Sequence, residues 1–101
     1  MEKHLLITSL RQSVKKINLP LDDISIYLFG SFGKSPSASD IDLLLIYDEK
    51  KISVSKILEI RKKLYANHKN ISHLPLDISI LNISEEREVN FIFHEKAIQL
   101  L

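Results

Sequence analysis

The fold of this chain is decided by residues 24–47, which read ISIYLFGSFGKSPSASDIDLLLIY. Two runs rich in β-branched, aromatic and leucine residues, 24–29 and 41–47, enclose a stretch rich in glycine and serine. Runs of this length and composition are typical of β-strands, and glycine, proline and serine between them are typical of a loop. The sequence therefore predicts two strands joined by a loop over residues 30–39.

Helices are expected before and after this strand pair. Residues 2–17 and roughly 52–67 both carry apolar residues at the spacing of one helical face, with polar residues between them. Ser84, followed by acidic residues, is typical of a helix N-terminus. The apolar faces of the first two helices consist of Leu6, Leu10, Val14 and Ile17, and of Val54, Ile57, Leu58, Leu64 and Tyr65.

A third strand is predicted over residues 74–81, and residues 97–101 suit a short edge strand. The expected fold class is α/β (α+β): a small mixed sheet of three to four strands, covered by helices on one face. A chain of 101 residues fits one domain, so we expect residues 1–101 to form a single domain.

The alternation of side chains along a strand places carboxylates on the face opposite the apolar residues. Asp40 and Asp42 share one side of the second strand, and Asp77 falls on the matching side of the third. If the strands are neighbours in register, the three carboxylates converge. Such a group suits Mg²⁺ or Mn²⁺, which can assist phosphoryl transfer. The alternative is that Asp40 caps a strand start while Asp42 and Asp77 are solvated surface residues.

Apolar residues accompany the aspartates on this second face. A small soluble chain seldom leaves such a cluster bare, so we expect it to be covered. The cover is either the chain's own N-terminal helix or C-terminal segment, or another polypeptide. The cluster consists of Tyr27, Phe29, Leu44, Ile46 and Leu81.

The loop after the first strand has features of a phosphate-binding turn. Gly30 and Ser31 directly follow an apolar strand, and Lys34 comes shortly after. Glycine lets the backbone approach a phosphate closely, while the hydroxyl and the ammonium group supply a hydrogen bond and a charge. The loop lacks the G-x-x-x-x-G-K-[ST] pattern, which argues against a Walker-type NTPase. A glycine–serine turn alone is more often only a turn.

Together these segments resemble the signature of the DNA polymerase beta-type nucleotidyltransferase superfamily. In that family a strand ends in Gly-Ser, a strand with Asp-x-Asp follows, and a later strand carries a third acidic residue. The matching segments here are residues 28–31 (LFGS), 39–45 (SDIDLLL) and 76–78 (LDI). The resemblance implies a polymerase-beta-like palm and a nucleotidyltransferase activity.

The resemblance also implies roles for individual residues. Asp40, Asp42 and Asp77 would be the catalytic residues and the metal ligands, with Mg²⁺ or Mn²⁺ as cofactor and ATP or another NTP as substrate. Asp77 would also help activate the acceptor hydroxyl. Many relatives carry an arginine after Gly-Ser, where this chain has Phe32 and Lys34. The nucleotide-binding residues would be Gly30, Ser31, Lys34 and Ser39.

The small size is similar to that of the minimal nucleotidyltransferases of bacteria and archaea, which are often encoded beside a helical HEPN protein. Some of those act as antitoxins that transfer AMP to a tyrosine of the partner. The resemblance thus implies transfer of AMP from ATP to a hydroxyl of a HEPN-like partner, within a toxin–antitoxin pair. A second copy of the chain could complete the site instead. The alternatives are a non-catalytic module that neutralises a toxin by occlusion, and transfer to a small molecule.

Composition excludes several other classes. The net charge of +1 lacks the basic bias of a dedicated nucleic-acid binder, so direct nucleic-acid binding is not expected. The lack of cysteine excludes disulfides and thiolate metal sites and suits a cytoplasmic protein. No stretch approaches the roughly 20 apolar residues that span a bilayer, so no membrane segment is expected. The histidines show no metal-ligand spacing and are expected at the surface: His4, His68, His73 and His94.

Overall fold

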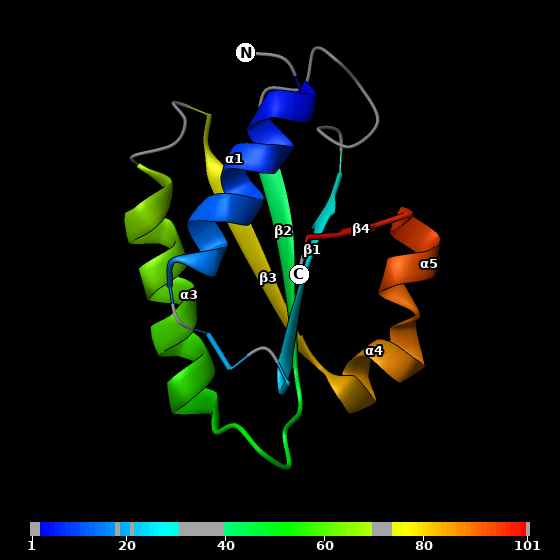
Figure 1. Cartoon of the computed structure of the whole chain (residues 1–101). Coiled ribbons are helices and arrows are strands. Elements are labelled where there is room, and N and C mark those ends of the chain that lie inside the picture. The colour runs from blue at the N-terminus through cyan, green and yellow to red at the C-terminus, as the bar shows by residue number, and fades with distance from the viewer. Residues whose placement is uncertain (1–2, 18, 21, 31–39, 70–73, 101) are drawn as a thin grey trace.

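The computed structural model describes residues 3–17, 19–20, 22–30, 40–69 and 74–100. Within these residues four strands form one mixed sheet in the order β3-β2-β1-β4 (Figure 1). The strands are β1 (Ile24–Phe29), β2 (Ile41–Tyr47), β3 (Leu76–Asn82) and β4 (Ile98–Gln99). The helices are α1 (Lys3–Lys15), α3 (Val54–His68), α4 (Ile83–Val89) and α5 (Phe91–Glu95).

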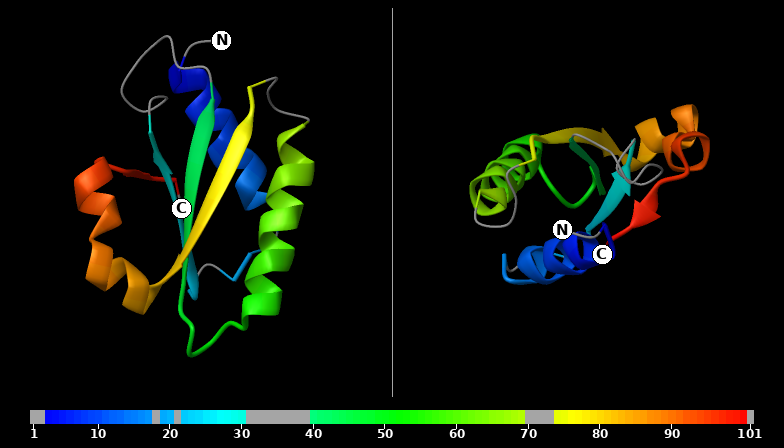
Figure 2. Two further views of the ribbon diagram at one scale, coloured as in Figure 1. Left: turned by 180° about the vertical axis from the view of Figure 1, so that it is seen from behind. Right: turned by 90° about the horizontal axis from the view of Figure 1, so that it is seen from above.

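The sheet is mixed because its strands pair in both senses. β1 pairs antiparallel with β2 and with β4, whereas β2 and β3 are parallel. Helices α1 and α3 cover one face, and α4 and α5 lie toward the other, as Figure 2 shows from behind and from above. The predicted fold class is confirmed. Among the described residues, each helix is too short or too polar to span a lipid bilayer.

The hydrophobic core lies between the sheet and helices α1 and α3. Ile26, Leu28 and Leu45 are fully buried there, and Leu10 and Val14 of α1 belong to the same cluster. These residues are the apolar positions that the sequence assigns to the inward faces. Removal of their apolar surface from water is the main term that favours folding.

Helix α3 is turned differently from the prediction. The sequence predicts Val54, Leu58 and Tyr65 on the core-facing side, but these three residues are exposed. The buried residues follow one another at intervals of three or four, which is the spacing of one helical stripe. The prediction is wrong for the three exposed residues because they lie beside that stripe. The stripe consists of Ile57, Ile60, Leu64 and His68.

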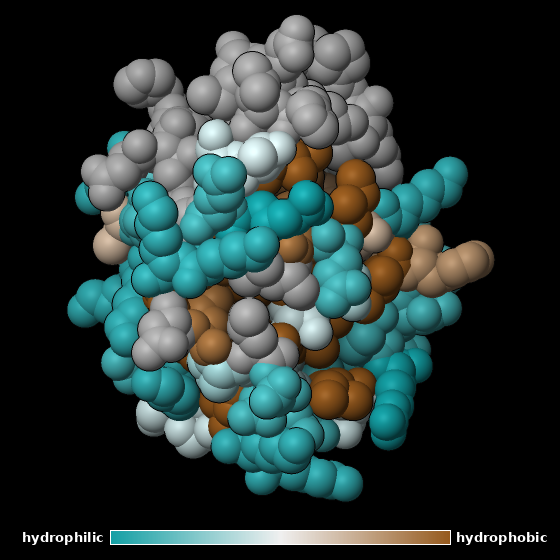
Figure 3. Space-filling model, viewed as in Figure 1, coloured by the Kyte–Doolittle hydropathy of each residue, from teal (hydrophilic) through white to brown (hydrophobic). Residues whose placement is uncertain are grey.

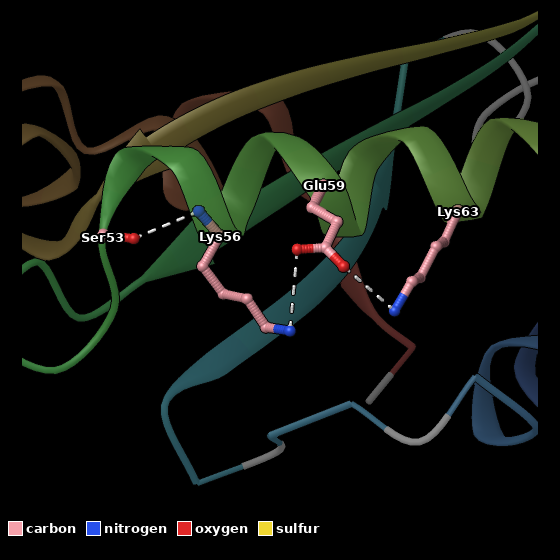
Figure 4. Close-up of polar contacts among 4 residues, drawn as sticks. All are labelled: Ser53, Lys56, Glu59 and Lys63. Atoms are coloured by element: carbon pink, nitrogen blue, oxygen red, sulfur yellow. Dashed lines mark hydrogen bonds and ion pairs between the residues drawn. The ribbon is translucent and has the colours of Figure 1, made fainter.

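Polar contacts stabilise the outer side of α3 (Figure 4). The Ser53 hydroxyl accepts a hydrogen bond from the Lys56 N–H at 3.2 Å and caps the helix. The Glu59 carboxylate lies 3.9 Å from the Lys56 ammonium and 3.5 Å from that of Lys63. Exposed pairs of this kind contribute only about 0.2–0.5 kcal/mol each. Figure 3 shows the molecule from the side seen in Figure 1, where hydrophilic residues surround smaller hydrophobic areas. The buried stripe therefore decides how α3 sits on the sheet.

The prediction of a surface position is also wrong for His68. Its side chain is buried, and its Nε2 lies 2.7 Å from the carbonyl oxygen of Leu74. Because a carbonyl only accepts, Nε2 carries the proton and donates. The contact joins the last residue of α3 to Leu74, two residues before β3 begins. His94 is exposed as predicted, while His73 and the side chain of His4 lie outside the described residues.

Helix α4 begins before the predicted cap. Its N-cap is Asn82, whose side-chain oxygen accepts from the Glu85 N–H at 2.8 Å. The Glu85 carboxylate in turn accepts from the Asn82 N–H at 2.9 Å. This reciprocal capping box satisfies two N–H groups that the helix itself leaves without partners. The Ser84 hydroxyl instead donates to Glu49 Oε1 at 2.9 Å, so the prediction of Ser84 as the cap is wrong.

Two neighbouring residues of α3 test its orientation. Ile57→Ala should lower the free energy of unfolding by about 2–5 kcal/mol, because it removes a buried side chain and leaves a cavity. Leu58→Ala, the matched control, should change it by only about 0.5 kcal/mol, because Leu58 is 42% exposed. Urea unfolding of both variants checks this. Equal losses would contradict the observed orientation of α3.

Candidate active site

The end of β1 and the beginnings of β2 and β3 meet at one end of the sheet, at the top of Figure 1. The register places Phe29 opposite Asp42, and Asp42 opposite Asp77. Residues directly opposite each other on neighbouring strands project from the same face. Phe29, Asp42 and Asp77 therefore form one row across the face that α1 and α3 leave free. The structure thus brings together two of the three predicted carboxylates as direct neighbours.

Asp40 lies immediately before β2 and is half-buried. Burial is the largest cause of a raised pKa at Asp42, and repulsion by the carboxylates of Asp40 and Asp77 raises that pKa further. Asp40 and Asp77 therefore both act electrostatically on Asp42. Among the described residues, however, no three histidine, aspartate or glutamate side chains are gathered closely enough to hold a metal ion by themselves. A cation here would complete its shell with phosphate oxygens and water, as Mg²⁺ commonly does.

Gly30 is required by the geometry beside Asp42. It ends β1 with a φ of 78°, in the left-handed region that favours glycine. A Cβ atom at this position would overlap Asp42 Oδ2 and lie 3.1 Å from Asp42 Cγ. The backbone of the glycine turn therefore approaches the carboxylate more closely than a side chain would permit. Ser31, Lys34 and Ser39, the other predicted nucleotide-binding residues, lie outside the described residues.

The C-terminal segment borders the site; the sequence indicates such a cover for the apolar cluster but not which of its residues provide it. The Phe91 ring of α5 meets the Phe29 ring edge to face, with centroids 4.7 Å apart and an interplanar angle of 89°. Leu44 and Ile46, on the same face of β2, are buried. The expectation that part of this apolar cluster is covered from within the chain is confirmed for these two residues. Phe29 and Phe91 are far apart in the sequence, so no local pattern indicates that they meet.

The arrangement can concentrate negative charge beside a backbone turn. Asp77 is exposed on the edge strand β3, whereas Asp42 is partly enclosed between its neighbours. Carboxylates in such a group are stabilised by a divalent cation, for which oxygen ligands are preferred. The donor set therefore fits a magnesium or manganese ion shared with a phosphorylated substrate.

Gly30→Ala should be strongly destabilising. The left-handed φ and the overlap with Asp42 Oδ2 together should cost about 2–4 kcal/mol of unfolding free energy. In an Asp42→Ala background the same substitution should cost less, because only the backbone term remains. A double-mutant cycle measured by chemical unfolding checks this. An unchanged cost in that background would show that the contact with Asp42 is not responsible.

Asp42→Asn should stabilise the fold at neutral pH. The folded protein binds the Asp42 proton more tightly than the unfolded chain does, since its pKa lies above the ordinary 3.8. Ionisation therefore costs stability: the cost is absent below the ordinary pKa and fully present above the raised pKa. The variant should gain up to about 1 kcal/mol at neutral pH, because water screens this partly open site. Thermal unfolding should show the gain shrinking as the pH falls towards 3.8. A gain that does not depend on pH would contradict the assignment.

Comparisons with known proteins bear on the fold and on the family. Among solved structures the chain is similar to a candidate nucleotidyltransferase from Sulfolobus solfataricus, with a TM-score of 0.59 and 17% sequence identity. The alignment covers 96% of this chain and 80% of that chain, and at this identity it shows the fold alone. A comparison with curated proteins gives no match. A family model described as "Nucleotidyltransferase domain" matches residues 7–100, and the chain therefore belongs to the nucleotidyltransferase domain family.

Proposed function

We propose that this chain is a metal-dependent nucleotidyltransferase that moves AMP from ATP to a hydroxyl group of a partner protein. The proposal treats residues 1–101 as one nucleotidyltransferase domain. Members of this family usually use a nucleoside triphosphate and a divalent metal ion. The observation that carries the proposal is the pairing of Asp42 with Asp77 beside the Gly30 turn.

Asp40, Asp42 and Asp77 are the residues that would hold the metal ion. When bound, a divalent cation neutralises charge on the phosphate oxygens and stabilises the attacking and leaving oxygens. The repulsion that raises the pKa of Asp42 supports this role, because a cation would relieve it. Gly30 would bind the triphosphate through its backbone, together with Ser31, Lys34 and Ser39.

The reaction joins the acceptor hydroxyl oxygen to the α-phosphorus of ATP. The bond from that phosphorus to the bridging oxygen breaks, and pyrophosphate leaves. Asp77 would take the hydroxyl proton, since it is the carboxylate on the outer strand of the sheet. Its exposure allows an acceptor to approach from outside the sheet.

A protein acceptor is supported by the resemblance of the chain to the minimal nucleotidyltransferases. Large apolar side chains stand in solvent, with Val54 60% and Phe93 72% exposed. Single exposed apolar side chains on separate helices are ordinary and do not mark a protein contact, so the acceptor class rests on that resemblance. We propose a helical HEPN-type partner, with this chain as the antitoxin of the pair. The second candidate is a module that neutralises a toxin by occlusion without catalysis.

Labelled transfer tests the proposed reaction. The chain is incubated with Mg²⁺, ATP labelled at the α-phosphate and a HEPN-type helical protein as candidate acceptor, and label on that protein is measured. Asp42→Asn and Asp77→Asn should each reduce the transfer about 100-fold or more. Asp22→Asn, with the same charge change at the opposite end of β1, is the control and should retain it.

Two outcomes would reject the enzymatic proposal. One is that the intact chain transfers no label, and the other is that Asp42→Asn transfers as much as the unchanged chain. Preserved neutralisation of the toxin by an Asp40→Asn/Asp42→Asn variant would favour occlusion instead.

A further inference from the structure

We infer that Phe91 is a positioning residue for the metal site: its ring packs against Phe29 and so keeps the end of β1, with the Gly30 backbone, against the Asp42 carboxylate. The inference rests on the proposed function, because it concerns the same carboxylates. By this inference helix α5 helps to form the site, although none of the predicted site residues lies on α5.

The Asp42 carboxylate is confined on the side of β1. Phe29 stands directly opposite it in the strand register, and the Gly30 backbone leaves no room for a methyl group beside Oδ2. On the other side its neighbour in the register is Asp77, which is exposed. The Asp42 carboxylate therefore lies against the Gly30 backbone, and a shift of the end of β1 would change the space beside Oδ2.

Phe91 is the residue that keeps the Phe29 ring in place. Both rings are half-buried, and they meet edge to face at 4.7 Å. Edge-to-face contacts are directional, so this one favours a single orientation of the Phe29 ring. Loss of the Phe91 ring would let Phe29 move into the vacated space, and the adjoining Gly30 backbone would then shift relative to Asp42.

The chain fixes Phe91 by specific backbone contacts. Asn90, between α4 and α5, has a left-handed φ of 51° that redirects the chain. The Glu86 carboxylate then accepts the Phe91 N–H at 3.1 Å and the Ile92 N–H at 3.2 Å. Lys96 ends the helix with a second left-handed φ of 51°. Left-handed backbone is unfavourable for residues other than glycine, so the surrounding contacts must hold it.

The segment beyond α5 is also attached firmly. The Leu100 N–H donates to the Ile26 carbonyl oxygen at 2.8 Å, and Arg11 Nε donates to the Leu100 carbonyl oxygen at 3.1 Å. These bonds join Leu100 to α1 and to β1. β1 is the strand that carries Phe29. The chain is therefore fixed both before Phe91, through Glu86, and after it, through Leu100.

Helix α5 offers a matched control for the experiment. Phe93 lies two residues from Phe91 but is 72% exposed, with its ring against His94 at 5.7 Å. Val14 offers a second control, because it is buried in the core on the other face of the sheet. Phe93→Ala removes the same ring from the same helix, and Val14→Ala destabilises the fold without touching the site.

Direct metal binding tests the inference. Mn²⁺ binding to the full chain is measured by electron paramagnetic resonance in the presence of a non-hydrolysable ATP analogue, at a temperature where every variant is folded. Phe91→Ala should weaken Mn²⁺ binding roughly 10-fold or more, as loss of supporting contacts commonly does at metal sites. Phe91→Tyr, which keeps the ring, should bind nearly as the unchanged chain does, and so should Phe93→Ala and Val14→Ala. If Phe91→Ala does not fold, Phe91→Leu, which keeps apolar volume but no ring, gives the same test.

The outcomes separate this inference from the proposed function. Unchanged Mn²⁺ binding by Phe91→Ala, or equal weakening by Val14→Ala, would overturn the positioning role while leaving the proposed function intact. If the unchanged chain binds no Mn²⁺ with the analogue, or if Asp42→Asn binds it equally well, the proposed function itself fails.

Discussion

The parallel pairing of β2 with β3 is the constraint on which the site depends. The Ile41 N–H donates to the Pro75 carbonyl oxygen at 2.9 Å, and from there the register sets Asp77 beside Asp42. A slip of one residue would turn Asp77 to the core face, because side chains alternate along a strand. His68 helps to prevent it by holding Leu74 just before β3. The helix that connects the two strands thus also aligns the carboxylates.

One face of the sheet stabilises the fold, and the other carries the carboxylates of the candidate site. The face under α1 and α3 buries the apolar side chains that stabilise the fold. The other face carries Asp42, whose pKa is raised by burial and by neighbouring carboxylates, an arrangement that costs stability. A site of this kind can be maintained only when a separate core supplies the stability.

A side chain of α3 bonds to the outer edge of β3. The Tyr65 hydroxyl accepts the Ile78 N–H at 3.0 Å, and this leaves fewer free backbone groups on β3 for pairing with another strand.

The strands and their carboxylates could be predicted from the sequence, and other features could not. The two runs that became β1 and β2 have strand composition and clear limits, and the period of two places Asp42 and Asp77 on one face. Helix α3 carries apolar residues on two adjoining stripes, so spacing alone could not decide which stripe is buried. Asn82 and Glu85 form a capping box that the sequence does contain, but Ser84 with its acidic neighbours was an equally plausible cap. The contact of Phe29 with Phe91 depends on the tertiary fold and has no local signal.

The central claim is that Asp42 and Asp77 share a divalent cation. A crystal of the chain grown with Mn²⁺ and a non-hydrolysable ATP analogue tests it most directly, through the anomalous scattering of manganese. The account predicts an anomalous peak about 2.0–2.2 Å from a carboxylate oxygen of each residue, with phosphate oxygens completing the shell. A manganese ion bound to the phosphates with neither carboxylate in contact, or bound elsewhere on the chain, would contradict it.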